Sequence, residues 1–336
     1  MKKFAKLLSV LLVVTLAVLC FAGCGETGEA PDNPSANKDS YKIGVIQYIS
    51  HPSLDNCYNG IAKAFEGKSN ITIDRQIGSD ASADADCAAY AKKMVADKCD
   101  MIFAIATPAA ASAFAAVEGT DIPVVFCAVS DPVAAELVQS MDAPGYNCTG
   151  TSDVLDLNAQ LDLIQEMQPD VKSIGILYTT SEANSISNLN TFKELAAKRN
   201  LTVEASGVQN ASDIPAAATA LAGKVDCINN FTDNNVVNNL TVVLDAAKTA
   251  GIPVYGSEVE QVKNGCLASV SIDYVALGKA TGDMGLDILL NGAKASEMAV
   301  KTITDATPVI NTDVLASLNM KTPDKYKNAE TVKTNA

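Results

Sequence analysis

The feature that most restricts the fold of this chain is an order of elements that occurs twice. Four short apolar segments begin at residues 41, 71, 100 and 121, and matching segments begin at 172, 201, 226 and 251. The offsets are 126 to 131 residues, and helix-forming stretches lie between the segments. Strands that alternate with helices form parallel sheets. The repeat therefore predicts two α/β lobes of one design, with a cleft between them.

The boundaries of the lobes follow from the order of these elements. The expected helices span 56–66, 85–97 and 108–118 in the first half, and 186–200, 214–222 and 236–250 in the second. A further helix, at 274–290, comes too late for the second repeat, so we expect it to cross back to the first lobe. The first lobe should then contain 41–152 and 274–295, and the second 153–273 and 296–336. Three crossings between lobes can work as a hinge.

The N-terminus is typical of an exported chain. Lys2 and Lys3 precede an apolar run over 7–21, and small residues follow before Cys24. A basic start, a short apolar core and a small-residue cleavage site form a signal peptide, here 1–23. Cys24 resembles the lipidated cysteine of a bacterial lipobox, and 24–40 would be a tether. The alternative is an uncleaved anchor helix, for which the apolar run is short. We expect an extracytoplasmic protein attached to the membrane through Cys24.

Charge and cysteine content exclude other classes of function. The formal net charge is −14, and removal of the three signal-peptide lysines leaves 22 basic and 39 acidic residues, or −17. An acidic surface repels phosphate backbones, so nucleic acid is not an expected partner. Seven cysteines follow Cys24, without a CxxC pair. An odd number argues against a complete disulfide framework, and we interpret them as buried thiols.

The residues for common catalytic and metal centres are scarce. His51 is the only histidine, so a zinc site lacks a second imidazole and a catalytic triad would have to use this residue. We expect no metal, no cofactor and no catalytic residue. His51 precedes Pro52, and we interpret it as a loop residue that hydrogen-bonds locally.

Polar side chains follow the predicted strands at the edge that would face the cleft. The buried run 101–106 ends at Thr107, a residue suited to cap a helix, and Pro108 fits the first helical position. The free N–H groups of such a helix favour an anion. Since Arg75 and Arg199 are the only arginines and neither follows a strand, a carboxylate would be bound by neutral donors such as Thr107, Ser130 and Ser185.

Acidic residues crowd the same edge and suit an ammonium group. An acid end and an amine end together describe an amino acid zwitterion, and Tyr48, Tyr178, Phe231 and Tyr274 could pack on its side chain. About half of the polar residues could instead only cap helices. The candidate ligand-binding residues are Gln47, Tyr48, Ala106, Thr107, Pro108, Ser130, Asp131, Ser152, Asp153, Glu182, Asn184, Ser185, Thr232, Asp233, Asn234, Glu258 and Asp273.

Several of these segments together resemble a known family. The chain is similar to bacterial ABC-transporter substrate-binding lipoproteins of the tryptophan/tyrosine-binding type through 47–55, 104–110, 129–133, 150–153, 182–185, 232–234 and 272–274. The resemblance implies the type I periplasmic-binding-protein fold and a monomeric receptor without enzymatic activity. Such a receptor captures an aromatic amino acid and delivers it to a membrane permease that is driven by a cytoplasmic ATPase.

Two other functions stay open at this point. A surface sensor would use the same fold to present its closed form to a signalling partner. A hydrolase could use paired carboxylates in the cleft for acid–base chemistry, although the sequence contains no nucleophile–base pair or phosphate-binding loop.

Overall fold

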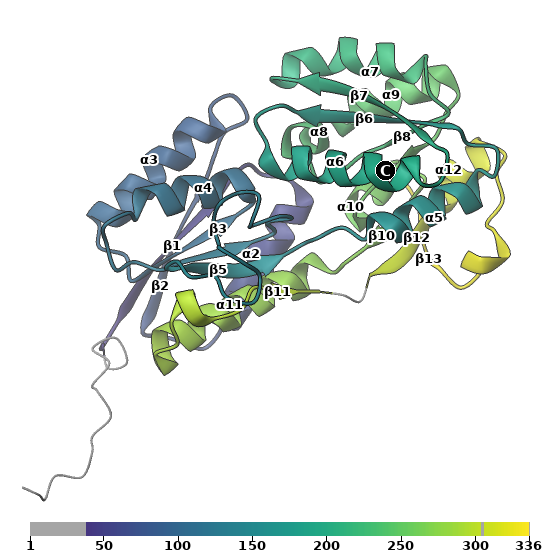
Figure 1. Ribbon diagram of the computed structural model, residues 1–336. Coiled ribbons are helices and arrows are strands. Elements are labelled where there is room, and N and C mark those ends of the chain that lie inside the picture. Colours follow the sequence, from purple (N-terminus) through teal and green to yellow (C-terminus); the bar gives the residue numbers. More distant parts are fainter. Residues whose placement is uncertain (1–37, 304–305, 336) are drawn as a thin grey trace, which may run out of the picture.

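The computed structural model describes residues 38–303 and 306–335, which form two α/β lobes (Figure 1). The expected signal peptide 1–23, Cys24 and most of the tether 24–40 lie outside the described residues. The first lobe has a parallel sheet of six strands in the order β11 (Lys301–Thr302), β5 (Cys148–Ser152), β4 (Val124–Cys127), β3 (Met101–Ile105), β1 (Tyr41–Gln47) and β2 (Ile71–Ile77).

Helices cover both faces of this sheet (Figure 1). One face carries α3 (Ala83–Ala96) and α4 (Thr107–Ala116), and the other carries α2 (Pro52–Ala64) and α11 (Tyr274–Asn291). A buried cluster joins α2 and α11 to Phe103 at the centre of the sheet. Because a side chain at Gly278 would collide with the backbone carbonyl of Cys57, α11 approaches α2 closely only with glycine there. The late helix therefore completes the core of the first lobe.

The second lobe repeats the design with a smaller sheet. Its four parallel strands lie in the order β7 (Thr202–Val208), β6 (Ser173–Thr179), β8 (Cys227–Asn229) and β9 (Val254–Tyr255). One face packs on α5 (Leu157–Met167) and α6 (Ala183–Ala197), and the other on α7 (Ile214–Ala222) and α9 (Leu240–Ala250). Two short helices, α8 (Asn234–Asn238) and α10 (Val259–Lys263), follow β8 and β9.

The C-terminal part of the chain adds a second sheet to this lobe. It contains β10 (Ala268–Ser271), β12 (Thr307–Asn311) and β13 (Glu330–Val332), and β10 pairs antiparallel with β12. The remaining short elements are η1 (Ala211–Asp213), η2 (Ala295–Glu297), α12 (Thr312–Ser317) and η3 (Asp324–Tyr326). The prediction of parallel sheets holds for the two main sheets, and the antiparallel pair is an addition that the repeat did not indicate.

Two expected boundaries differ from the structure. Strand β11 belongs to the first sheet, so the chain leaves the first lobe after Thr302 and not near residue 296. The helix expected over 236–250 is divided at Asn239, whose φ and ψ of −110° and 22° leave the helical region. Three asparagines before the break explain it, since asparagine is a poor helix former.

Three connections between the lobes lie side by side. Residues from all three connections line one cavity: Val154 and Leu155, Ile272, and Ile303 with Ala306. Three parallel connections restrict the relative motion of two lobes mainly to a hinge. The edges of the two main sheets that carry the helix N-termini face each other next to this hinge.

Candidate functional site

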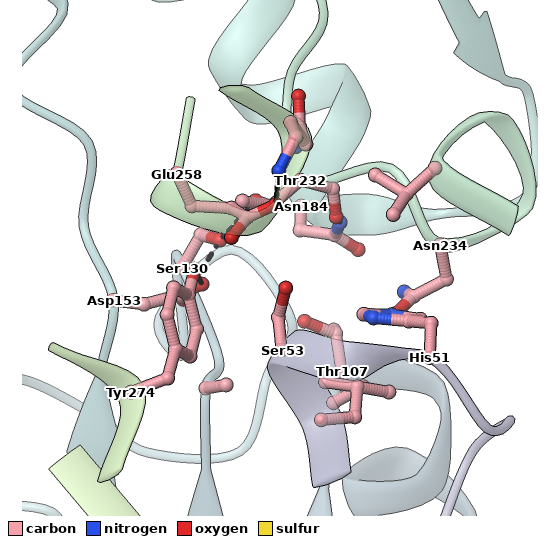
Figure 2. Close-up of a pocket in the computed structure, with 15 residues that line it drawn as sticks. His51, Ser53, Thr107, Ser130, Asp153, Asn184, Thr232, Asn234, Glu258 and Tyr274 are labelled. Carbon is pink, nitrogen blue, oxygen red and sulfur yellow. Dashed lines mark hydrogen bonds between the residues drawn. The ribbon is translucent and has the colours of Figure 1, made fainter. Parts of the chain in front are cut away.

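A pocket lies between the lobes at the carboxyl ends of their strands (Figure 2). It contains about 360 Å³ of space between atoms, part of which is open to solvent. The lining residues are His51, Ser53, Leu54, Ala106, Thr107, Ala128, Ser130, Asp153, Asn184, Thr232, Asn234, Val237, Glu258, Gln261 and Tyr274.

The first-lobe wall is built from the N-termini of α2 and α4. Pro52 and Pro108 stand in the first turns of these helices, where a missing N–H costs nothing. The residue that precedes α4 is Ala106, with a φ of +81°, and no side chain caps this helix. We expected Thr107 to be the cap; it is instead the first helical residue, and its buried side chain lines the pocket. The uncapped N–H groups favour an anionic ligand group.

A cluster of three polar side chains lies beside the hinge. Asp153 accepts hydrogen bonds from the Ser130 hydroxyl at 3.0 Å and from the Tyr274 hydroxyl at 2.9 Å. Burial raises the pKa of Asp153, and the two hydroxyl donors oppose that shift. Because Asp153 follows β5 and Tyr274 begins α11, two of the three connections between the lobes place polar groups in this corner.

The second-lobe wall depends on Glu182, which lies behind the lining residues. This buried carboxylate accepts from the Asn234 side chain at 2.8 Å, the Asn234 backbone at 3.1 Å and the Asn184 amide at 3.2 Å. Burial, and then the neighbouring Asp233, raise its pKa. Glu182 therefore orients the two asparagines that face the pocket.

Glu258 is the second carboxylate that lines the pocket. It precedes α10, and its oxygens accept from the backbone N–H groups of Glu260 and Gln261, both at 2.7 Å. Burial raises the pKa of Glu258 to about 7, although these two donors favour its charged form. A cation placed in the pocket would bind the deprotonated side chain.

Several pocket side chains lack hydrogen-bond partners. Among the described residues, seven buried polar side-chain atoms have none, and four of these belong to the pocket: both ring nitrogens of His51, Oγ of Ser53 and Oδ1 of Asn184. A buried polar atom without a partner costs about 1–3 kcal/mol, and unpaired groups concentrate where a ligand completes the site. The pocket is thus built for a ligand with several polar groups.

The two lobes contact each other directly at the rim of the pocket. The Ser187 hydroxyl on α6 donates to Asp131 Oδ2 at 2.5 Å, and the hydroxyls of Ser130 and Thr232 are 3.4 Å apart. Both contacts join residues that lie on opposite sides of the hinge. The structure therefore has the lobes closed on the pocket.

The structure brings eight of the predicted site residues to the pocket surface: Ala106, Thr107, Ser130, Asp153, Asn184, Thr232, Asn234 and Glu258. Others form the shell behind it. Ser152 donates to the backbone carbonyl of Ser130, and Ser185 donates to Asp233. Asp233 also accepts from the backbone of Thr179 and Val236, so its oxygens are fully used within the lobe.

The remaining predicted residues lie elsewhere. Gln47 hydrogen-bonds Asp55 and Arg75, and Asp273 caps α11 from an exposed position. Pro108 does not reach the pocket, and Tyr48 lines a separate groove between the lobes. Asp131 belongs to the rim contact already described. Among the predicted aromatic contacts, Tyr274 reaches the pocket, whereas Tyr178 and Phe231 pack in the core of the second lobe.

Sequence reasoning missed His51 and Ser53. The expectation that His51 hydrogen-bonds locally is wrong, because neither ring nitrogen has a partner among the described residues. The available signal was its place directly before Pro52, the residue that opens α2 at the pocket edge. Gln261, Leu54, Ala128 and Val237 also line the pocket and carry no comparable signal.

The described part of the chain shows other features that bear on function. It contains no group of three or more histidine, cysteine, aspartate or glutamate side chains placed to hold a metal ion. Its helices are too short or too polar to cross a membrane. Seven cysteines are buried and unpaired, which confirms their interpretation as thiols.

Comparison with known proteins gives one consistent family. Residues 42–333 match the family described as ABC transporter substrate binding protein. A tyrosine-binding protein from Clostridioides difficile (strain R20291) is 36% identical over 330 residues, which cover 96% of this chain and 94% of that protein.

Two solved structures are similarly related. An ABC domain from Streptococcus pneumonia in complex with L-Trp is 36% identical, with a TM-score of 0.83 over 87% of this chain and 100% of that chain. The ligand-free, open structure of a substrate binding protein with adhesive properties from Clostridium difficile is 38% identical, with a TM-score of 0.67 over 88% of this chain and 100% of that chain. These relatives of the chain are substrate-binding proteins and not enzymes, and the chain belongs to the ABC transporter substrate-binding protein family.

Proposed function

We propose that this protein captures an aromatic amino acid, namely tryptophan, tyrosine or phenylalanine, in the pocket between its lobes and delivers it to an ABC importer. The observation that carries the proposal is the set of four unpartnered buried polar atoms in a pocket closed by both lobes. The tyrosine-binding relative and the L-Trp complex support the ligand class.

The zwitterion has a natural orientation in this pocket. Its carboxylate would bind at the N-termini of α2 and α4, where Ser53 and Thr107 supply hydroxyl donors (Figure 2). Its ammonium would bind on the opposite side, where the free Oδ1 of Asn184 and the carboxylates of Asp153 and Glu258 are the acceptors. The hydroxyl donors and the helix dipoles of α2 and α4 thus replace the arginine that often binds a carboxylate.

The proposed mechanism is closure of the lobes around the ligand. The two solved relatives have nearly equal identity and coverage, yet the TM-score is 0.83 with the L-Trp complex and 0.67 with the open, ligand-free structure. The lobes are therefore arranged more as in the complex. A ligand that contacts both lobes binds the closed form more tightly and shifts the population toward it, which gives the permease a form to recognise.

The proposal includes the location of the protein and the extent of its lobes. Removal of 1–23 and lipidation of Cys24 would attach the body to the outer side of the cell membrane. The first lobe would comprise 38–152 and 274–302, and the second 153–273 and 306–335. Substitution Cys24→Ala should release the protein from the membrane fraction, and a variant that stays bound would contradict the lipid anchor.

The chain offers a direct binding assay because it contains no tryptophan. All indole fluorescence in a titration then comes from L-Trp, whose emission should change on transfer from water to the pocket. L-Tyr and L-Phe are tested by competition. The variant Asn184→Leu removes an ammonium acceptor and should weaken binding of the three ligands by about 10-fold or more. The absence of binding by all three amino acids to the wild-type protein would refute the proposed ligand class.

A further inference from the structure

The His51 imidazole is a polar group that the binding of a zwitterion does not use. His51 directly precedes α2, with a φ of −152° and a ψ of 158°, and its side chain makes no capping hydrogen bond. The residue is partly exposed, but both ring nitrogens are buried and have no hydrogen-bond partner among the described residues. Burial lowers the pKa of His51 to about 4. The ring is therefore neutral near pH 7 and offers one N–H donor and one acceptor.

The surroundings of His51 distinguish this end of the pocket from the other. Figure 2 shows its ring beside Asn234 and across the pocket from Asp153 and Glu258. The amide nitrogen of Asn234 is already used, because it donates to Glu182, and the interaction of the Asn234 side chain with His51 partly opposes the fall in the pKa of His51. Leu54 on α2, the helix that follows His51, and Val237 on α8, the helix that contains Asn234, also line the pocket. This end thus combines apolar walls with one neutral polar ring.

We propose that His51 hydrogen-bonds the polar group on the ligand's aromatic ring, the hydroxyl of tyrosine or the N–H of tryptophan, and so selects these ligands against phenylalanine. The inference rests on the proposed function and specifies its ligand. A phenol can both donate and accept, and an indole N–H can donate, so either can pair with a neutral imidazole. Phenylalanine has no polar group on its ring and would leave the ring nitrogens of His51 without a ligand partner. A site built to hydrogen-bond a ligand rejects the analogue that lacks the hydrogen-bonding group.

Calorimetric titration with L-Tyr, L-Trp and L-Phe tests the inference. The wild-type protein should bind L-Tyr and L-Trp about 10- to 100-fold more tightly than L-Phe, as expected for one buried hydrogen bond. The substitution His51→Leu should weaken L-Tyr and L-Trp by that factor and leave L-Phe unchanged or tighter. The control Ser53→Ala removes another unpartnered atom from the first turn of α2, directly after His51, and it should weaken binding of the three ligands equally.

The outcomes separate this inference from the proposed function. If wild-type protein binds L-Phe as tightly as L-Tyr and L-Trp, the inference is wrong and the aromatic-receptor function stands. If His51→Leu weakens the three ligands by one factor, His51 contacts the shared amino acid group and the inference is wrong. Binding of none of the three overturns both. The comparison of wild-type affinities needs no variant, so misfolding of His51→Leu would not protect the inference.

Discussion

The contact between Ser187 and Asp131 provides a test of closure that does not alter the pocket. The Ser187 hydroxyl on the second lobe donates to Asp131 Oδ2 on the first at 2.5 Å, and neither residue lines the pocket. An opening of the hinge separates these two residues. Substitution Ser187→Ala should therefore destabilise the closed form and leave the open form unchanged.

The magnitude follows from the charge and exposure of the two residues. A hydrogen bond to a charged acceptor contributes about 1.5–3 kcal/mol when it is buried. Both residues are only partly buried, so solvent competes and about 1 kcal/mol is a better expectation. Because the closed form binds the ligand, this loss should raise the dissociation constant by about 5-fold. The change should be in the dissociation rate, since Ser187 helps to keep the closed lobes together.

The assay is the L-Trp fluorescence titration of Ser187→Ala, with stopped-flow measurement of dissociation. Ser317→Ala is a matched control, because Ser317 is an exposed serine of the second lobe whose hydroxyl bonds only the nearby Val314 carbonyl. Asp131→Asn completes a double-mutant cycle that isolates the pair from other effects of each substitution. A dissociation constant for Ser187→Ala equal to that of Ser317→Ala would show that the contact does not stabilise closure.

Two further predictions concern stability. Burial raises the pKa of Glu258 from 4.5 to about 7, so the native protein keeps a proton that the unfolded chain loses between these values. The contribution of Glu258 to the free energy of unfolding should be complete below pH 4.5 and fall by up to about 3 kcal/mol as the pH rises to about 7. Urea unfolding of Glu258→Gln should show a weaker pH dependence than the wild-type protein over this range, and an equal pH dependence in the two proteins would contradict the shift. Gly278→Ala should lower the melting temperature although alanine favours helices, because its methyl group would collide with the Cys57 carbonyl; unchanged or higher stability would contradict the close packing of α11 on α2.

The fold was largely predictable because its information is local and repeated. Apolar strand segments at matched spacing required two parallel sheets, and the late helix at 274–290 had no place in the second repeat. The extra sheet was less accessible, since β10, β12 and β13 are joined over long sequence distances and lack a repeat. The place of β11 depends on only two exposed residues, Lys301 and Thr302, which carry no apolar pattern.

The site was predictable as a region, but the role of each residue was not. A serine, threonine or aspartate before a helix has the same sequence signature whether it caps the helix or faces a ligand. Asp273 caps α11, whereas Thr107 lies one position past the cap because Ala106 adopts a positive φ. A positive φ at alanine is unfavourable and leaves no mark in the sequence. The role of His51 was not predictable for a similar reason: the packing of the two lobes, and not the sequence around residue 51, buries its ring nitrogens without a hydrogen-bond partner among the described residues.

The interleaving of the two lobes has a consequence for how the chain is made. The continuous segment 153–273 supplies most of the second lobe, but the first lobe also needs α11 and β11, and the second also needs β12 and β13, which are all synthesised later. A ribosome therefore releases the first 152 residues with one sheet face covered by α2 alone, and α11, which completes that face, follows more than a hundred residues later. Both lobes are therefore completed only when the polypeptide is nearly finished, the first by α11 and β11 and the second by β12 and β13.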